Sequence, residues 1–143
     1  NLARVDIKWR VDDLRGYIKD ETVIEILAYD VLEHLPVKKV AGALDEWLRI
    51  LEPKGVLDIR VPDLDILAET MYKFKNNYAE MSHMVDRLYG GQDYPQNFHC
   101  AGFNLTIMKK LLEEERGMKI THMSRGNCNL RVIAQKGEKT CRY

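Results

Sequence analysis

Short alternating or apolar runs and longer periodic blocks divide the chain into strands and helices. Residues 5–11 alternate apolar and polar side chains, which is the two-residue period of a half-buried strand. The apolar run Val23–Tyr29 is short and rich in branched residues, and it predicts a second, more buried strand. Residues 56–61 alternate again and predict a third strand. One face of this third strand is expected to meet water.

Helical periodicity fills the segments between and after these strands. After Pro36, apolar residues recur every three or four positions up to Leu51, which predicts a helix. Residues 52–55, with the sequence Glu-Pro-Lys-Gly, end this helix because proline cannot continue the hydrogen-bond ladder. A stripe of apolar residues from Leu67 to Leu88 predicts one long helix, or two helices broken near residues 76–77.

The C-terminal part predicts one more helix and a closing pair of strands. Asn104 can cap a helix that ends at Gly117. Residues 118–123 and 130–134 predict two strands joined by a turn. Alternating strands and helices followed by this pair predict a single α/β domain over residues 1–143. Its sheet is expected to be mostly parallel, with an antiparallel C-terminal strand pair.

Composition and charge narrow the classes of function. The 22 Lys and Arg residues equal the 22 Asp and Glu residues, so there is no basic excess to bind a nucleic-acid backbone. Apolar runs are too short to span a membrane and no basic start leads into a hydrophobic segment, so we expect a cytoplasmic protein without a membrane partner. The three cysteines include no CxxC pair, which predicts neither a disulfide framework nor a zinc cluster.

Three sequence motifs together resemble a known family. They are LAYDVLEHLP at residues 27–36, LEPKGVLDIR at residues 51–60 and VPDLD at residues 61–65. Their order is similar to the second half of class I S-adenosylmethionine-dependent methyltransferases of the type 11 kind, over about residues 5–134. The resemblance implies a Rossmann-like, truncated methyltransferase sheet. It also implies transfer of a methyl group from S-adenosylmethionine to a small-molecule acceptor.

The same resemblance implies where the cofactor binds. Asp13 and Leu14 stand where the family binds the adenine, through a carboxylate and the following backbone amide. Tyr29 and Asp30 stand where the methionine end lies. Because ligands of open α/β sheets bind at the carboxyl edge, these four residues are expected to converge on one cleft there. For Asp13 the alternative is a capping role in a turn.

A stretch of polar and aromatic residues without a period contains Tyr94 and His99, two candidates for binding the acceptor. A hydrogen-bonded loop histidine is the alternative for His99. A nucleophilic pair of His99 and Cys100 is disfavoured, because sequence neighbours rarely face each other. Glu33 and His34 are not expected to form an acid–base dyad for a similar reason. No catalytic residue is assigned, since methyl transfer needs mainly alignment of the acceptor.

The chain departs from the family at its start. Family members begin with a strand and a glycine-rich turn that approaches the cofactor, whereas no glycine precedes Gly16 here. We therefore expect this chain alone to bind S-adenosylmethionine weakly or not at all. Three arrangements are open: a fragment of a longer protein, a strand at residues 5–11 that moves across to pair with Val23–Tyr29, or a partner chain that fills the gap. The third predicts a homodimer. The alternative function is a non-catalytic α/β module for oligomerisation or partner binding.

Overall fold

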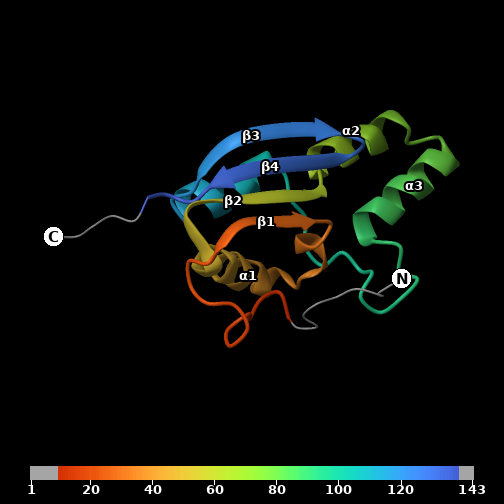
Figure 1. Ribbon diagram of the computed structural model, residues 1–143. Coiled ribbons are helices and arrows are strands. Elements are labelled where there is room, and N and C mark those ends of the chain that lie inside the picture. The colour runs from red at the N-terminus through yellow and green to blue at the C-terminus, as the bar shows by residue number, and fades with distance from the viewer. Residues whose placement is uncertain (1–9, 139–143) are drawn as a thin grey trace.

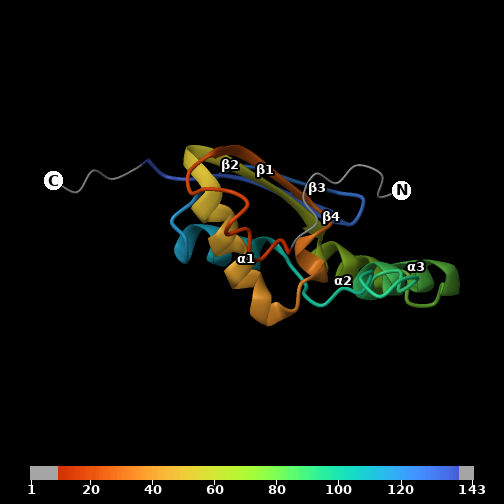
Figure 2. The same ribbon diagram turned by 60° about the horizontal axis from the view of Figure 1, so that its bottom comes forward.

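The computed structural model describes residues 10–138, whose helices lie on one side of a four-stranded sheet (Figures 1 and 2). The strands are β1 (Val23–Tyr29), β2 (Leu51–Pro62), β3 (Lys119–Gly126) and β4 (Asn129–Gln135), in the spatial order β1-β2-β4-β3. β1 and β2 pair in parallel, while β4 is antiparallel to both β2 and β3. The expected α/β class and the antiparallel closing pair are confirmed. Within residues 10–138 the sheet is mixed rather than mostly parallel, because only β1 and β2 pair in parallel and β4 lies antiparallel between β2 and β3.

Within the described residues, six helical segments lie between the strands. They are the 3-10 turn η1 (Leu32–His34), α1 (Val37–Ile50), α2 (Leu64–Lys73), α3 (Tyr78–Tyr89), α4 (Leu105–Lys109) and the π-helical turn η2 (Lys110–Glu114). The predicted break in the long apolar stripe is confirmed, because Asn77 caps α3 by accepting a hydrogen bond from the Glu80 amide at 3.3 Å. Asn104 caps α4 through the Ile107 amide at 3.0 Å, also as predicted.

Two segments differ from the sequence-based expectation or lie partly outside the described residues. α1 ends at Ile50, and the segment that was expected to be a turn after it already belongs to β2. Gly55 is required within this strand, because a Cβ there would lie 2.8 Å from the carbonyl oxygen of Glu52. The predicted strand at residues 5–11 lies mostly outside the described residues. Its last two residues are described, and they are not part of a strand.

The hydrophobic core lies between the sheet and the helices α1, α4 and η2. Alternate residues of the two central strands point to this side and are fully buried, namely Leu57, Ile59, Val61, Leu130, Val132 and Ala134. Trp47 from α1 and Met108 from α4 pack against them. The two-residue period of β2 therefore directs one face of the sheet to the core, as the sequence predicts.

The opposite face of the sheet carries no helix in residues 10–138 (Figure 2). A polar cluster lies there, in which Asp58 accepts a hydrogen bond from the Tyr29 hydroxyl at 2.7 Å and two from Arg131 at 2.9 and 2.6 Å. The outer edge of β1 has no strand partner within the described part of the chain. Ile24 and Leu27 on this strand are 70% and 60% exposed. No helix in the described range is both long enough and apolar enough to cross a membrane.

Candidate functional site

Two cavities open at the carboxyl edge of β1 and β2, where ligands of open α/β sheets bind. The outer cavity has a volume of about 670 Å³ and is lined by residues from three segments, 10–12, 30–39 and 94–100. The inner cavity has a volume of about 460 Å³ and lies between η1, the end of β2, α3 and the loop that follows α3. Asp30 and His34 line both cavities, so the two spaces adjoin at these residues.

The outer cavity holds a carboxylate that stays ionised. Asp12 accepts a hydrogen bond from Arg10 at 2.7 Å and lies 3.4 Å from the Lys39 amine. The pKa of Asp12 is lowered to about 2, chiefly by the hydrogen bond from Arg10 and to a smaller extent by Lys39. Tyr94 and Phe98 contribute aromatic rings to the same lining. The outer cavity therefore offers a carboxylate fixed between two cations, Arg10 and Lys39, beside apolar walls, a combination of polar and apolar lining that is typical of small-molecule sites.

Contacts with Arg60 of β2 fix Asp30 at the junction between the two cavities. The Asp30 amide donates a hydrogen bond to the Arg60 carbonyl oxygen at 2.9 Å, and the Arg60 guanidinium pairs with the Asp30 carboxylate. Asp30 has a φ of 54°, a left-handed conformation that is uncommon for a residue with a side chain. Such a conformation persists where the surroundings determine it, often at functional sites. The carboxylate of Asp30 is thus fixed at the rim that both cavities share.

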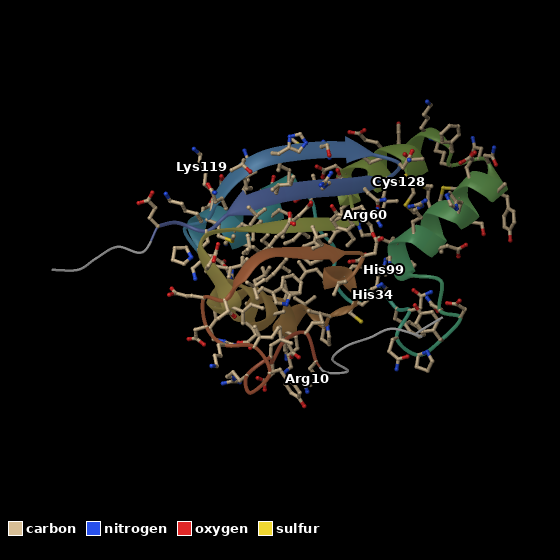
Figure 3. All side chains as sticks on the ribbon, viewed as in Figure 1. Arg10, His34, Arg60, His99, Lys119 and Cys128 are labelled. Carbon is tan, nitrogen blue, oxygen red and sulfur yellow. The ribbon has the colours of Figure 1, made fainter. Side chains whose placement is uncertain are left out.

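The inner cavity contains a buried glutamate and two histidines. Glu33 is only 1% exposed, and burial raises its pKa to about 7, with a smaller contribution from the Asp30 charge. The rings of His34 and His99 meet edge to face with centroids 4.8 Å apart. Burial lowers the pKa of His99, and electrostatic repulsion from the neighbouring His34 adds to this shift. Figure 3 shows His34 and His99 side by side with Arg60 at this end of the sheet.

Within residues 10–138 no hydrogen bond joins Glu33 and His34, in agreement with the expectation that they form no acid–base dyad, but their side chains do not point apart. One potential ligand atom from each of Glu33, His34 and His99 lies within 4.8 Å of the other two. Side chains of sequence neighbours point apart on an α-helix, whereas residues 32–34 form a single 3-10 turn. His34 is also held by the loop, because its Nδ1 lies 3.1 Å from the Phe98 carbonyl oxygen.

The structure separates the four residues expected to converge. Asp30 lines both edge cavities, but the Tyr29 hydroxyl reaches Asp58 on the opposite face of the sheet. The reason is the strand alternation, since the neighbouring Ala28 points into the core. The prediction that one cleft receives all four side chains is therefore wrong.

The other two residues of that set also lie away from the junction. Leu14 lines a third, apolar cavity against Trp47, which shares Val11 and Val31 with the outer cavity. The Leu14 amide donates a hydrogen bond to Glu46 at 2.7 Å. The Asp13 carboxylate accepts a hydrogen bond from Arg15 at 2.9 Å. The two acceptor-site candidates divide between the spaces, with Tyr94 lining the outer cavity and His99 the inner one.

No family model and no curated protein matches the sequence, but solved methyltransferases match the fold. A methyltransferase from Methanosarcina mazei that depends on S-adenosylmethionine matches 92% of this chain with a TM-score of 0.64 and 17% identity. The 1,6-didemethyltoxoflavin-N1-methyltransferase of Burkholderia thailandensis, with S-adenosylhomocysteine bound, also matches 92% at a TM-score of 0.62 and 16% identity. The chain has the methyltransferase fold. It spans 66% of the length of the first enzyme and 50% of the second.

This methyltransferase fold confirms the resemblance drawn from the three motifs. The cavity linings also contain residues that the sequence did not single out. Asp12 and Asp13 are adjacent in the sequence, so the pattern does not distinguish which of the two lines the cavity. Arg60 occupies a polar position of a strand with alternating polar and apolar residues. This pattern does not indicate that its guanidinium lines a cavity at the carboxyl edge of the sheet. Glu33 lies inside a motif already singled out, but only its burial distinguishes it from a surface glutamate.

Proposed function

We propose that this chain forms the acceptor side and part of the cofactor site of a methyltransferase that uses S-adenosylmethionine. The observation that carries the proposal is the pair of adjoining cavities at the carboxyl edge of a methyltransferase sheet, with Asp30 and His34 in both linings. The cofactor, when bound, supplies a methyl group activated by its sulfonium. The outer cavity would take the cofactor and the inner cavity a small-molecule acceptor.

The residues of the outer cavity fit part of this cofactor. The Asp12 carboxylate can accept hydrogen bonds from an adenine amine, and the rings of Tyr94 and Phe98 offer apolar surface to a nucleoside. Asp30, at the inner end, places a negative charge where a sulfonium would meet the acceptor. This assignment replaces Asp13 and Leu14 by Asp12 as the adenine-side candidate, because Asp12 is the one that lines the cavity.

The residues of the inner cavity position the acceptor. Arg60 holds the Asp30 carboxylate at the junction, and His99 contributes an imidazole from the facing loop. Transfer between two bound partners needs close and in-line placement more than a strong base. We therefore assign orientation of the acceptor to Arg60 and His99, and separation of the two ligands to the rim at Asp30 and His34.

Calorimetric titration with S-adenosylhomocysteine tests the cofactor assignment. We expect saturable but weak binding, with a Kd on the order of 1 mM, because the chain spans only part of its structural relatives. Asp12→Asn should weaken binding about tenfold, since it removes the charge from a charge-assisted hydrogen bond. The matched control Asp13→Asn should leave the affinity unchanged. Equal losses in both variants would contradict the assignment, and so would an unaffected Asp12→Asn variant.

A second candidate function is a non-catalytic module that associates with another copy of itself. The exposed side chains of Ile24 and Leu27 on the unpaired edge of β1 favour it, because apolar strand edges promote association. A twofold dimer covering this edge is the expected product. Sedimentation velocity at micromolar concentration should show a dimer that Ile24→Lys converts to monomer. A wild-type monomer at these concentrations would contradict this candidate.

A further inference from the structure

Three potential metal ligands meet in the lining of the inner cavity. Glu33 and His34 come from η1, and His99 comes from the loop after α3, 65 positions beyond His34 in the sequence. Their ligand atoms lie within 4.8 Å of one another. A tetrahedral ion with bonds of about 2.1 Å places its ligands about 3.4 Å apart, so small side-chain rotations bring these atoms to coordination distance.

Both histidines keep one ring nitrogen free of these backbone contacts. Nδ1 of His34 lies 3.1 Å from the Phe98 carbonyl oxygen, and Nδ1 of His99 lies 3.0 Å from the Arg87 carbonyl oxygen. A carbonyl oxygen only accepts hydrogen bonds, so each Nδ1 carries the proton and donates it. Each Nε2 is then left with its lone pair. Metal-bound histidines are oriented in this way by a partner on the second nitrogen.

The buried carboxylate is an independent indication of a cation. Oε2 of Glu33 has no hydrogen-bond partner in residues 10–138, and the residue is 1% exposed. Burying an acceptor without a partner is unfavourable, and buried charges are normally paired or coordinate metals. A divalent cation between Glu33 and the two imidazoles would satisfy this oxygen.

The two segments that supply the ligands are fastened to each other. The amides of Cys100 and Ala101 donate hydrogen bonds to the Glu33 carbonyl oxygen at 2.7 and 3.1 Å. The His99 amide donates to the Tyr89 carbonyl oxygen at 3.0 Å. Gly90 permits this contact, because its φ is 80° and a Cβ there would lie 2.4 Å from the Asn97 carbonyl oxygen. The backbone therefore sets the ligand positions before any ion binds.

We propose that Glu33, His34 and His99 bind one divalent transition-metal ion, with Zn²⁺ as the favoured species. Two imidazoles and one carboxylate suit zinc or its first-row neighbours, whereas Mg²⁺ and Ca²⁺ prefer sites made of oxygen ligands. Three protein ligands leave at least one coordination position open. If the proposed function holds, this position faces the cavity of the acceptor and takes an oxygen or nitrogen atom of that molecule.

Metal titration of the complete 143-residue chain tests the site without any cofactor. After treatment with EDTA, the chain should bind one equivalent of Zn²⁺ with a micromolar or lower Kd, measured by calorimetry. His99→Ala and the near-isosteric Glu33→Gln should each weaken binding at least about tenfold, a loss of one ligand's coordination. His83→Ala is the matched control, because His83 lines the same cavity outside the cluster. It should leave the affinity within about twofold of wild type.

Three outcomes would overturn the metal site. The first is no Zn²⁺ binding at 100 µM protein, a concentration on the order of typical calorimetric titrations. The second is an equal loss of affinity in His83→Ala and His99→Ala. The third is a thiolate-to-metal charge-transfer band on binding Co²⁺, which would place the ion on a cysteine such as Cys100. Since none of these measurements involves S-adenosylmethionine, failure of the metal site and failure of the methyltransferase proposal are distinguishable.

Discussion

Replacing Glu33 by glutamine is expected to stabilise the metal-free protein at pH 8 far more than at pH 5. Burial raises the pKa of Glu33 to about 7 from an ordinary value of 4.5. The folded state therefore binds the proton more tightly than the unfolded state. The resulting stabilisation is fully present below the unfolded pKa, and it is lost as the pH rises through the folded pKa. Glutamine mimics the protonated form at every pH.

The expected size of this effect is about 3 kcal/mol, from a shift of roughly two and a half units at 1.36 kcal/mol per unit. Urea unfolding in EDTA at pH 5 and pH 8 gives the unfolding free energies of the variant and of the wild type. The effect is the gain in unfolding free energy of the variant at pH 8 minus its gain at pH 5. Glu25→Gln, at an exposed position of β1, corrects for the general effect of removing one carboxylate. A difference that does not change with pH would show that the folded state holds Glu33 ionised.

Asp63→Ala should lower the free energy of unfolding by about 2–4 kcal/mol, because the substitution removes a helix cap and breaks the ion pair between a buried carboxylate and the partly exposed Arg125. Asp63 is fully buried and accepts hydrogen bonds from Arg125 at 2.6 and 3.0 Å. Its Oδ1 also accepts from the Asp65 amide at 3.0 Å, which caps α2. One side chain thus joins the end of β2, the start of α2 and the end of β3.

Chemical denaturation of two variants separates the contributions. Asp63→Asn keeps an oxygen that can cap α2 but loses the charge that pairs with Arg125, so it should cost less than Asp63→Ala. Arg125→Ala leaves the carboxylate buried without its partner and should also be strongly destabilising. A loss below about 1 kcal/mol for Asp63→Ala would show that this contact is dispensable, since it would match an ordinary surface substitution.

The local periods in the sequence predicted most elements of the fold. The run Val23–Tyr29 became β1 with the same bounds, and the block after Pro36 became α1. The strand order was not predictable from periodicity, because the insertion of β4 between β2 and β3 depends on contacts between distant segments. The three sequence motifs indicated a methyltransferase sheet, which the hydrophobic periodicity alone could not predict.

The candidate site was less predictable because it depends on side-chain direction at element ends. Asp12 and Asp13 have equivalent sequence signals, yet only Asp12 lines the outer cavity. Tyr29 and Asp30 are adjacent, but strand alternation and the left-handed backbone of Asp30 separate their side chains. The raised pKa of Glu33 results from burial of its side chain, and no local sequence pattern predicts that burial.

The most direct test of the two-cavity site is chemical-shift mapping of the ¹⁵N-labelled chain during titration with S-adenosylhomocysteine. Saturable shifts are expected for the amides of Val31 to Leu35, of Tyr94 and of residues 96–98, which border the outer cavity and its junction with the inner one. The hairpin of β3 and β4 is separated from β1 by β2 in the sheet, and its amide signals should not shift. Shifts centred on the open face at Asp58 and Arg131, or no saturable shifts at all, would contradict a cofactor site at the carboxyl edge.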